Sequence, residues 1–593
     1  MTDVNKLITD NIDVWTSAIK KRNSQGRGSS KKIELTGVKK LREFILELAV
    51  RGKLVSQDTN DESASVLLEK IAKEKAKRVA DKKIKKQKPL PAITDEEIPF
   101  VLPNGWEWLR LGNAGSGSTG KTPSTRNADF FGGNIQFIGP GNITPKGQLL
   151  EADKFLTELG VEQSTSAIAG DLLMVCIGGS IGKSALAIEH IAFNQQINAM
   201  QPIEVLSKFL KHTVSTRTFY NSVIEKSTGS ATPIINRGKW EELLIPIAPL
   251  AEQHRIVAKV DELMALCDQL EQQTEQSLAA HQTLVEVVLA ALTNCDSTED
   301  FQTSWQRIAE HFDVLFTTEL SIEKLKQTIL QLAVMGKLVP QNPSDEPASV
   351  LLEKIAEEKA QLIADKKIKK QKELPVITDE EKPFELPHGW EWVRFENIAK
   401  NEKNALKAGP FGSALKKSMY VESGYKIYGQ EQVISGNENI GDYFVDEDKY
   451  LSLESCKVQP DDILISLVGT IGKVLILSDS CTKGIINPRL VKLSLNHSIC
   501  KRFIKIMLGS QLIQDELFEK SHGSTMNVLN LGLLKQLIFP LPRIEEQQRI
   551  VTKVDELMAL CEQLKARLSD AQTTQLHLAD AVVENALSDQ TIS

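Results

Sequence analysis

The chain has 593 residues, 41% of them hydrophobic and 25% charged, which allows several globular domains and excludes a chain that is disordered throughout. Its net charge of −7 excludes a uniformly basic nucleic-acid binder, although charge acts locally, over about 10 Å at 0.1 M salt, so a basic segment can still contact phosphates. No segment approaches the roughly 20 apolar residues of a membrane span and the N-terminus lacks a secretory pattern, so we expect a cytoplasmic protein.

The N-terminal part of the chain is predicted to be helical after a polar start. Residues 1–35 form an N-terminal extension, and residues 36–99 form a first helical region. Within that region, residues 36–55 place apolar side chains on one helical face, and Gly52 is the predicted stop. We expect residues 62–88 to form a second helix that ends before a proline-containing acidic segment.

The C-terminal part of this second helix is strongly basic. Residues 69–88 contain ten lysines or arginines and three acidic residues, and residues 353–372, later in the chain, contain seven and four. Such a run is most often the solvated face of a helix. The alternatives are a stripe that contacts phosphates and a docking surface for a partner that also holds DNA, and the sequence leaves these readings open.

A glycine-rich string at 115–122, GSGSTGKT, matches the pattern of a phosphate-binding P-loop. Such a loop needs a preceding strand and a following helix whose N-terminus faces the phosphates. A strand is possible at 107–111, but Pro123 and the polar residues after it have no helical periodicity. An ATPase with coiled-coil arms is therefore a hypothesis that the sequence does not favour.

A long helix is predicted over residues 251–293, after a mixed α/β segment at 100–250. Seam positions alternate by four and three, which is a heptad pattern, and residues 545–593 repeat it. Each helix could pack on its own domain, but two equivalent seams in one chain favour an antiparallel coiled coil. The predicted seam positions are Ile256, Val260, Leu263, Cys267, Leu270, Thr274, Ser277, His281, Leu284, Val288 and Ala291, and then Ile550, Val554, Leu557, Cys561, Leu564, Leu568, Ala571, Gln575, Leu578 and Val582.

The chain is a tandem duplication. Residues 41–113 match residues 325–397 without a gap, with 51 identities in 73 positions. The long helices match as well, because residues 252–270 and 546–564 are identical at 16 of 19 positions. Repeated surfaces are expected to meet the same partner twice.

The segments between the repeated blocks diverge. Residues 114–245 and 398–539 share little more than a skeleton, in which GGSIGK at 178–183 echoes VGTIGK at 468–473. Two divergent domains in equivalent places are expected to read two different things. The remaining predicted segments are a connector (294–320), a second helical region that repeats the first (321–383) and a second α/β segment (384–544).

Catalytic and metal-binding motifs are not found. The seven cysteines are far apart without a C-x-x-C pair, so they are predicted to be reduced thiols rather than metal ligands. The chain has no Asn-Pro-Pro-aromatic string for adenine methylation, and Pro460-Asp461-Asp462 is not followed by the acidic-x-Lys of a nuclease. The histidines are scattered, and His281 is predicted to be a polar seam residue. We expect no catalytic residue, metal or cofactor in this chain.

The assembled motifs resemble those of the specificity subunits of Type I restriction–modification enzymes. LP-x-GWEW opens both divergent domains, at 102–108 and at 386–392. The supporting motifs are GKLV-x-Q (52–57, 336–341), GGNIQFIGPGNI (132–143), AGPFGSALKK (408–417), GDLLMVCIGGSIGK (170–183), NQQ (194–196) and EQ-x-RIV-x-KVDEL (252–263, 546–557). Together these motifs cover most of the chain from residue 36 to about 590, and the long basic insert is similar to that of the larger members.

The resemblance implies a fold and a function. The fold would be an α/β (α+β) tandem duplication, with two target recognition domains that contain small twisted sheets and are separated by long helices in an antiparallel coiled coil. The chain would be a non-catalytic subunit that recognises a bipartite, asymmetric sequence in double-stranded DNA. Its partners would be two copies of the methyltransferase subunit and two copies of the motor–nuclease subunit. S-adenosylmethionine, ATP and Mg would be held by those partners, and adenine methylation and ATP-dependent cleavage would be their work.

DNA contacts are expected from polar and basic loop residues of both domains. Four tryptophans, Trp106, Trp108, Trp390 and Trp392, are instead predicted to anchor each domain to its helix. The predicted DNA-binding residues of the first domain are Lys121, Thr122, Ser124, Arg126, Asn127, Gln195, Gln196, Ser230, Thr232 and Arg237. Those of the second domain are Lys407, Ser413, Lys416, Lys417, Gln430, Arg489, His522, Ser524 and Asn527. A structural scaffold that binds two identical proteins and no DNA is the remaining alternative.

Overall fold

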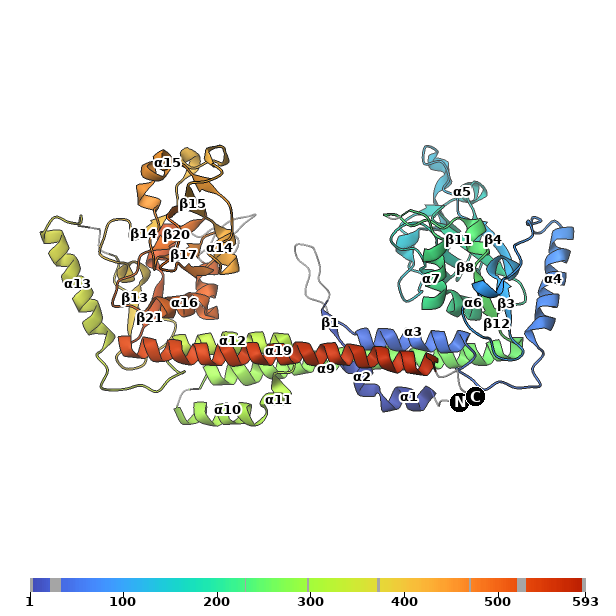
Figure 1. The fold of residues 1–593 in the computed structure, drawn as a ribbon, viewed down its shortest axis with the longest axis horizontal. Coiled ribbons are helices and arrows are strands. Elements are labelled where there is room, and N and C mark those ends of the chain that lie inside the picture. The colour runs from blue at the N-terminus through green and yellow to red at the C-terminus, as the bar shows by residue number, and fades with distance from the viewer. Residues whose placement is uncertain are drawn as a thin grey trace. The chain divides into compact units, whose positions relative to one another are not determined.

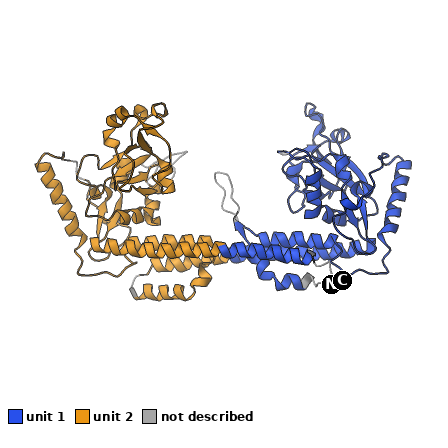
Figure 2. Cartoon of the chain, in the orientation of Figure 1, with its two compact units in different colours: residues 1–278, 570–593 blue, residues 279–569 orange. Residues whose placement is uncertain are grey.

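The structure is a computed structural model that describes residues 4–21, 33–229, 231–295, 298–370, 374–468, 471–519 and 530–588. The chain divides into two compact units (Figure 2). Unit 1 comprises Met1–Leu278 and Asp570–Ser593, and unit 2 comprises Ala279–Ser569. Within the described residues, no helix is both long and apolar enough to span a bilayer.

The base of unit 1 is a helical layer made from distant parts of the chain. It contains α1 (Val4–Asp10), α2 (Ile12–Ser17), α3 (Thr36–Val50), the first part of α9 (Leu250–Thr293) and the last part of α19 (Ile544–Ser588). Apolar side chains from all of these helices share one core. Arg42 on α3 donates to Asp268 on α9 at 2.7 Å, and Lys40 on α3 pairs with Asp580 on α19 at 2.5 Å. α3 is therefore held against both long helices.

Unit 2 repeats this layer with the long helices in exchanged roles. It contains α10 (Thr298–Glu310), α11 (Phe312–Leu315), α12 (Glu319–Val334), the last part of α9 and the first part of α19. Lys326 on α12 pairs with Glu562 on α19 at 2.6 Å, and Lys324 pairs with Glu286 on α9 at 3.3 Å. Each unit thus holds the start of one long helix and the end of the other, which is the antiparallel arrangement expected from the two seams.

The long helices follow the predicted seam only until about Thr274. Beyond it the buried side of α9 shifts by one residue, because Leu284 is 50% exposed whereas Val285 is 2% exposed. α19 shifts at the equivalent place, where Leu578 is 44% exposed and Ala579 is fully buried. A helix with 3.6 residues per turn drifts from a strict 3.5-residue repeat over several turns. The seam predictions that are wrong for this reason are Ser277, Leu284, Ala291, Ala571 and Leu578.

A mixed α/β domain stands on the helical layer of unit 1 (Figure 1). Its strands are β3 (Glu107–Arg110), β4 (Gly115–Thr119), β5 (Phe131–Ile138), β6 (Phe155–Leu156), β7 (Ser166–Ala167), β8 (Leu172–Val175), β9 (Ser184–Leu186), β10 (Ile191–Phe193), β11 (Ile197–Pro202) and β12 (Leu244–Ile247). Its helices are α5 (Glu158–Glu162), α6 (Ser207–Val214), α7 (Arg217–Lys226) and α8 (Arg237–Glu241). The strands form the sheets β4-β11-β8-β9, β6-β5-β10-β7 and β12-β3.

The α/β domain of unit 2 has the same plan. Its strands are β13 (Glu391–Arg394), β14 (Leu406–Ala408), β15 (Tyr425–Tyr428), β16 (Phe444–Val445), β17 (Ile463–Ser466), β18 (Val474–Ile476), β19 (Gly484–Ile486), β20 (Leu490–Leu493) and β21 (Ile538–Leu541). Its helices are α14 (Gln430–Ser435), α15 (Glu447–Ser452), α16 (Lys501–Gly509), α17 (Gln511–Glu519) and α18 (Leu531–Gln536). The sheets β14-β20-β17-β18, β16-β15-β19 and β13-β21 correspond to those of unit 1, which confirms a duplicated fold with small sheets.

The first and last strands of each domain pair with each other. β3 runs antiparallel to β12, with Trp108 opposite Pro246, and β13 runs antiparallel to β21, with Trp392 opposite Pro540. The long helix α9 starts three residues after β12. Both chain ends of each domain are therefore fixed beside the helix that follows, whatever lies between them.

A buried hydrogen bond joins each domain to its long helix. Trp106 Nε1 donates to Glu252 Oε2 on α9 at 2.9 Å, and Trp390 Nε1 donates to Glu546 Oε2 on α19 at 3.0 Å. Both tryptophans are at most 5% exposed, so the prediction that they anchor the domains is confirmed. Trp108 and Trp392 are half-buried and pack edge-on against Phe100 and Phe384 instead, in the chain that leads into each domain.

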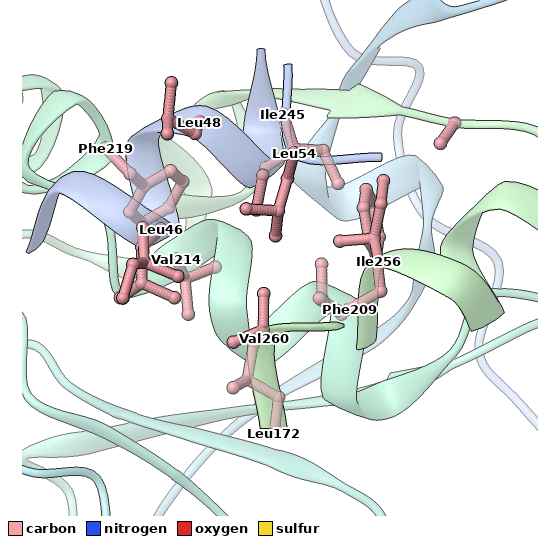
Figure 3. Close-up of a cluster of buried hydrophobic side chains, with 14 of the residues drawn as sticks. Leu46, Leu48, Leu54, Leu172, Phe209, Val214, Phe219, Ile245, Ile256 and Val260 are labelled. Atoms are coloured by element: carbon pink, nitrogen blue, oxygen red, sulfur yellow. The ribbon is translucent and has the colours of Figure 1, made fainter. Parts of the chain in front are cut away.

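Apolar packing surrounds this hydrogen bond in unit 1. Figure 3 shows side chains from α3, α6, β12 and α9 converging in one cluster. Ile256 and Val260, from the predicted seam of α9, are fully buried there. The seam residues of α9 therefore pack against the α/β domain of unit 1 as well as against helices. The labelled members are Leu46, Leu48, Leu54, Leu172, Phe209, Val214, Phe219, Ile245, Ile256 and Val260.

The basic helices end earlier than predicted. α4 (Ala64–Ala80) and α13 (Ala348–Ala364) stop eight residues before the predicted end at 88 and its repeat. In each copy the residue after the C-cap, Lys82 or Lys366, has φ of 57°, a left-handed conformation that terminates the helix. Residues 81–88 and the described residues 365–370 are thus loops and not helix faces.

Glu252 and Glu546 have different hydrogen-bond partners, so replacing each by glutamine is expected to change stability in opposite directions. Glu546 accepts from Trp390 and, through Oε1, from Gln341 at 2.6 Å, whereas Glu252 Oε1 has no partner among the described residues. A glutamine at 252 keeps the acceptor for Trp106 and removes a buried charge. We expect E252Q to keep or raise the melting temperature at pH 7–8, and E546Q to destabilise by about 1–3 kcal/mol because its amide faces the Gln341 donor.

The pH dependence follows from the pKa of Glu252, which burial raises above its usual value of 4.5. A folded-state pKa above the unfolded one makes the wild type lose stability as the pH rises through that range. The advantage of E252Q should therefore be present at neutral pH and shrink as the pH falls towards 4.5. Thermal melting of the full chain from pH 5 to pH 8 measures it, and equal melting curves for E252Q and E546Q would contradict the prediction.

Candidate nucleic-acid interface

Strand register brings three segments of the first domain to one sheet edge. In the sheet β4-β11-β8-β9, Asn198 lies opposite Thr119 and Ile197 lies opposite Val175. β4 and β8 therefore both end where β11 begins. The loop after β4, the turn before β11 and the turn after β8 meet there, and this meeting place is called the first edge.

Several predicted DNA-binding residues lie together at the first edge. Thr122 Oγ1 donates to Gln195 Oε1 at 2.6 Å, and the Lys121 backbone N–H donates to the Phe193 carbonyl at 3.0 Å. The Gln196 carbonyl accepts from the Cys176 N–H at 2.8 Å. The side chains of Lys121 and Gln195 are exposed. The edge therefore presents a polar surface whose backbone is tightly fixed.

The loop before α8 joins the same edge. The Gly178 N–H donates to the Pro233 carbonyl at 2.9 Å, and the Ile235 N–H donates to the Cys176 carbonyl at 3.0 Å. Thr232, within this loop, is exposed, whereas Ser230 lies outside the described residues. The loop is therefore held on the turn after β8.

Arg237, the first residue of α8, stands behind this edge. Its Nη1 lies 3.5 Å from the Gly117 carbonyl, and its Nε lies 3.4 Å from Glu241. Burial raises the pKa of Glu241, and the charges of Arg237 and Lys75 oppose that rise. Arg237 thus already has a buried carboxylate beside it.

The other predicted residues of the first domain lie on the loop between β4 and β5. Ser124 and Arg126 are exposed, and the Ser124 carbonyl accepts from the Asn127 N–H at 3.1 Å. Asn127 caps the short helical turn Ala128–Phe130, because its side chain accepts from the Asp129 N–H at 3.1 Å. Asn127 therefore has a structural role of its own.

Close packing explains why glycines occur in the P-loop-like string at 115–122. Gly115 to Thr119 form strand β4, and the structure has no helix directly after Lys121 in the described range 33–229. A Cβ at Gly117 would overlap the Glu241 carboxylate, and one at Gly120 would overlap the Asn194 carbonyl oxygen. The string is a strand in tight contact with its neighbours, so the ATPase hypothesis loses its only motif.

The Pro460-Asp461-Asp462 string is a turn. Asp461 has φ of 69°, and Gly170, which also has a positive φ, takes the equivalent position in the first domain. Asp462 is 1% exposed and accepts from the Gln459 N–H and, at 2.5 Å, from Ser494. Among the described residues no three His, Cys, Asp or Glu side chains gather as a metal site. His281 lies 3.0 Å from the Val314 carbonyl through Nε2, within a helical part of unit 2.

The second domain has an equivalent edge. Ala408 lies opposite Val491 and Ser466 lies opposite Leu490, so β14 and β17 both end where β20 begins. A Cβ at Gly409 would overlap the Asn487 carbonyl oxygen, as at Gly120 and Asn194. This second edge is therefore built by the same backbone contacts as the first.

Two predicted DNA-binding residues meet at the second edge. Arg489 Nη1 donates to Gln430 Oε1 at 3.3 Å, and Gln430 Nε2 donates to Ser466 Oγ at 2.8 Å. Arg489 is exposed. Gln430 therefore orients a guanidinium that still faces solvent.

The remaining predicted residues of the second domain are not at this meeting point. Lys407 lies within β14 opposite Lys492, and Ser413, Lys416 and Lys417 are exposed on the loop after β14. His522, Ser524 and Asn527 lie outside the described residues.

Sequence reasoning missed parts of both edges. Gly178 and Gly179 follow β8, and a Cβ at either position would meet open space, so their backbone is accessible to a ligand. Phe411, just after Gly409, is 78% exposed, which is unusual for so large an apolar side chain. The echo between GGSIGK at 178–183 and VGTIGK at 468–473 is the sequence signal that marks the first pair.

The two edges occupy the same place in two copies of one fold, but they carry different side chains. Such a molecule presents two distinct loop surfaces on one duplicated frame. Residues 103–280 and 389–571 each match the Type I restriction modification DNA specificity domain. The chain belongs to the DNA specificity subunits of Type I restriction–modification enzymes, which are recognition subunits and not catalytic ones.

Two relatives resemble the chain over its full length. The EcoAI specificity subunit of Escherichia coli is 41% identical over 99% of this chain and 100% of that subunit. The EcoEI specificity subunit of Escherichia coli is 38% identical over 99% and 100%. Among solved structures, the HsdS subunit from Thermoanaerobacter tengcongensis matches 84% of this chain and 100% of its own, at 19% identity and a TM-score of 0.38. Membership of the family rests on the sequence relatives, because that whole-chain likeness is low.

The packing at the two edges predicts which glycines tolerate a side chain. We expect Gly120→Ala and Gly409→Ala each to lower the melting temperature, because the new Cβ overlaps a backbone carbonyl and must displace a strand end. Gly179→Ala is the matched control, since open space surrounds it and its φ is ordinary. Thermal melting of the three variants checks this, and a loss of stability in G179A equal to that in G120A would contradict it.

Proposed function

We propose that this chain reads a bipartite, asymmetric sequence in double-stranded DNA and directs its partners to it. The observation that carries the proposal is the pair of equivalent sheet edges with divergent side chains on a repeated frame. One edge would read one half of the target, and the other edge the other half. The DNA between the halves would remain unread, because nothing in the duplication supplies a third recognition domain.

The exposed polar side chains at the edges support DNA as the ligand. Amide and guanidinium groups can each make two hydrogen bonds to one base edge in the major groove, as Gln to adenine and Arg to guanine. Gln195 and Arg489 offer these groups, and Lys121 offers a charge for phosphate. The other proposed contacts are Thr122, Ser124, Arg126, Asn127, Gln196, Ser230, Thr232, Arg237, Lys407, Ser413, Lys416, Lys417, Gln430, His522, Ser524 and Asn527.

The partners would supply the chemistry. The relatives are specificity subunits of restriction enzymes, and their membership of this family supports two methyltransferase subunits and two motor–nuclease subunits as partners. S-adenosylmethionine, ATP and Mg would be bound by those subunits. The repeated α3 and α12 layers would dock the two methyltransferase copies, since each unit presents an equivalent helical surface.

The bipartite target predicts a specific methylation pattern. We expect a host that expresses this chain with its methyltransferase subunit to carry one split motif, with one methylated adenine in each half. Replacing residues 114–245 by the equivalent segment of another member should change one half of the motif only, because β3 and β12 fix both ends of that segment. Methylation sequencing measures both. No chain-dependent motif would leave the scaffold alternative as the better account.

A single side chain tests the second edge. We expect Arg489→Ala, in the complex with the methyltransferase subunit, to weaken binding to the target by about 5-fold to 150-fold, the range for losing one two-pronged contact to guanine. The loss should be confined to one half of the motif. Arg502→Ala is the matched control, because Arg502 is exposed in the same unit but pairs with Asp555 on α19 at 2.6 Å. Equal binding by both variants, measured by titration of labelled duplex, would remove Arg489 from the interface.

A further inference from the structure

Two basic segments remain unexplained by the recognition edges. They are residues 81–86 and 365–370, called here the basic tips, and both read DKKIKK. The helices that precede them are less alike, since Lys73 corresponds to Glu357 and Arg78 corresponds to Leu362. The two copies therefore vary in the charge of the helix but are identical at all six positions of the tip. Ile84 packs against the core of unit 1, but the exposed lysines have no such reason to stay identical, so they carry a shared constraint.

The backbone conformation at the start of each tip is one in which lysine is unusual. The Lys82 N–H donates to the Val79 carbonyl and the Lys83 N–H to the Arg78 carbonyl, at 3.1 and 2.9 Å, which is a Schellman cap. Glycine is the usual residue at the left-handed position of such a cap, because a Cβ is disfavoured there. Lysine takes that position in both copies, at Lys82 and Lys366. A side chain that glycine lacks is kept at the cost of local strain.

Both ends of each tip are anchored. The helix cap fixes the start, and a buried arginine fixes the chain that returns from the tip. Arg110 is 3% exposed and donates to the carbonyls of Pro91 and Ala92 and to the Glu97 carboxylate, which it holds at a pKa of about 2. Arg394 fixes the chain that follows the second tip in the same way, by donating to the Pro375 carbonyl and the Glu381 carboxylate. The tips are thus presented by a rigid frame.

The lysines of the tips face solvent. Lys85, Lys86, Lys369 and Lys370 are exposed, and within the described ranges no ion pair or hydrogen bond joins them to another residue. Each tip carries four lysines and one aspartate, so the two tips together carry +6 in a chain whose net charge is −7. Lysine is depleted at protein–protein interfaces but is well suited to neutralising phosphates. The tips lie in the repeated part of the chain, so whatever they bind is the same in both copies.

We propose that the basic tips bind the phosphates of double-stranded DNA that flanks the two recognised half-sites. This inference rests on the proposed function, because it needs the edges to place the duplex. Phosphates are identical whatever the sequence, which fits identical tips next to divergent readers. In unit 1, the C-terminal end of α4 lies beside the α/β domain and away from the long helices, so the tip stands free of the helical layer (Figure 1).

The test compares two duplexes in the complex of the full chain with its methyltransferase subunit. One duplex ends at the outer limits of the methylation-defined target, and the other extends by about ten base pairs, one helical turn, on each side. We expect the wild type to bind the extended duplex more tightly, by about ten-fold. K85Q/K86Q leaves the second tip intact, so it should reduce that gain to about three-fold and lower the slope of log K against log salt by about 2, one for each lysine, without changing the preferred sequence.

Two further variants separate binding from folding. K70Q/K73Q is the matched control, because these lysines lie on α4 and already pair with Glu62 and Glu69. It should bind both duplexes as the wild type does. Lys82→Gly relieves the left-handed strain, so it should raise the melting temperature by about 2 °C and still weaken binding to the extended duplex.

The outcomes distinguish the two proposals. If the complex binds no defined duplex more tightly than random DNA, the proposed function fails. If it binds its target but affinity is independent of flanking length and of the tip lysines, only the role of the tips is overturned. Loss of the methyltransferase subunit from K85Q/K86Q, with unchanged DNA binding by the complex that remains, would overturn it too, in favour of an acidic protein surface as the partner.

Discussion

The hydrogen bond from the indole of Trp106 to Glu252, and its repeat between Trp390 and Glu546, is the contact on which the rest of the molecule depends. A buried carboxylate is unfavourable unless it is hydrogen-bonded, so each tryptophan must stay where its long helix begins. The pairing of first and last strands fixes the other end of each domain at the same place. Between these two fixed points the chain can change without moving the helix. The divergence of the two domains is therefore a consequence of how firmly their ends are held.

Within each domain the backbone constrains a few positions and leaves their neighbours free. Gly120 and Gly409 are both required by a carbonyl oxygen that a side chain would overlap. Asn236 and Asn530 both cap the helix that precedes the last strand, by accepting from an N–H three residues on. The residues that follow the two glycines differ completely, being Lys-Thr in one domain and Pro-Phe in the other. A fixed frame with free side chains at its edge is what allows one architecture to present two surfaces.

The duplication, the helices and the anchoring tryptophans could be predicted, because periodicity and repeated blocks are properties of the sequence alone. The end of α4 could not, since a lysine in the left-handed region stops the helix where no glycine or proline marks the stop. The drift of the seam beyond Thr274 could not be predicted either, because whether a helix follows a 3.5-residue or a 3.6-residue repeat depends on what packs against it. The meeting of Thr122 with Gln195 depends on strand register, which joins residues 73 positions apart and has no local signal.

The distribution of charge over the chain limits where phosphates can be bound. An overall net charge of −7 opposes binding of phosphates to most of the surface, so attraction is confined to the places where basic side chains gather. A uniformly basic chain would hold any duplex tightly and discriminate poorly, because the sequence-independent part of its affinity would dominate. Here the two tips gather eight lysines, while Arg237 is already placed beside a buried carboxylate. On the proposed function, acidic surface elsewhere would keep non-specific affinity low, and specificity would depend on the fit at the two edges rather than on the total charge.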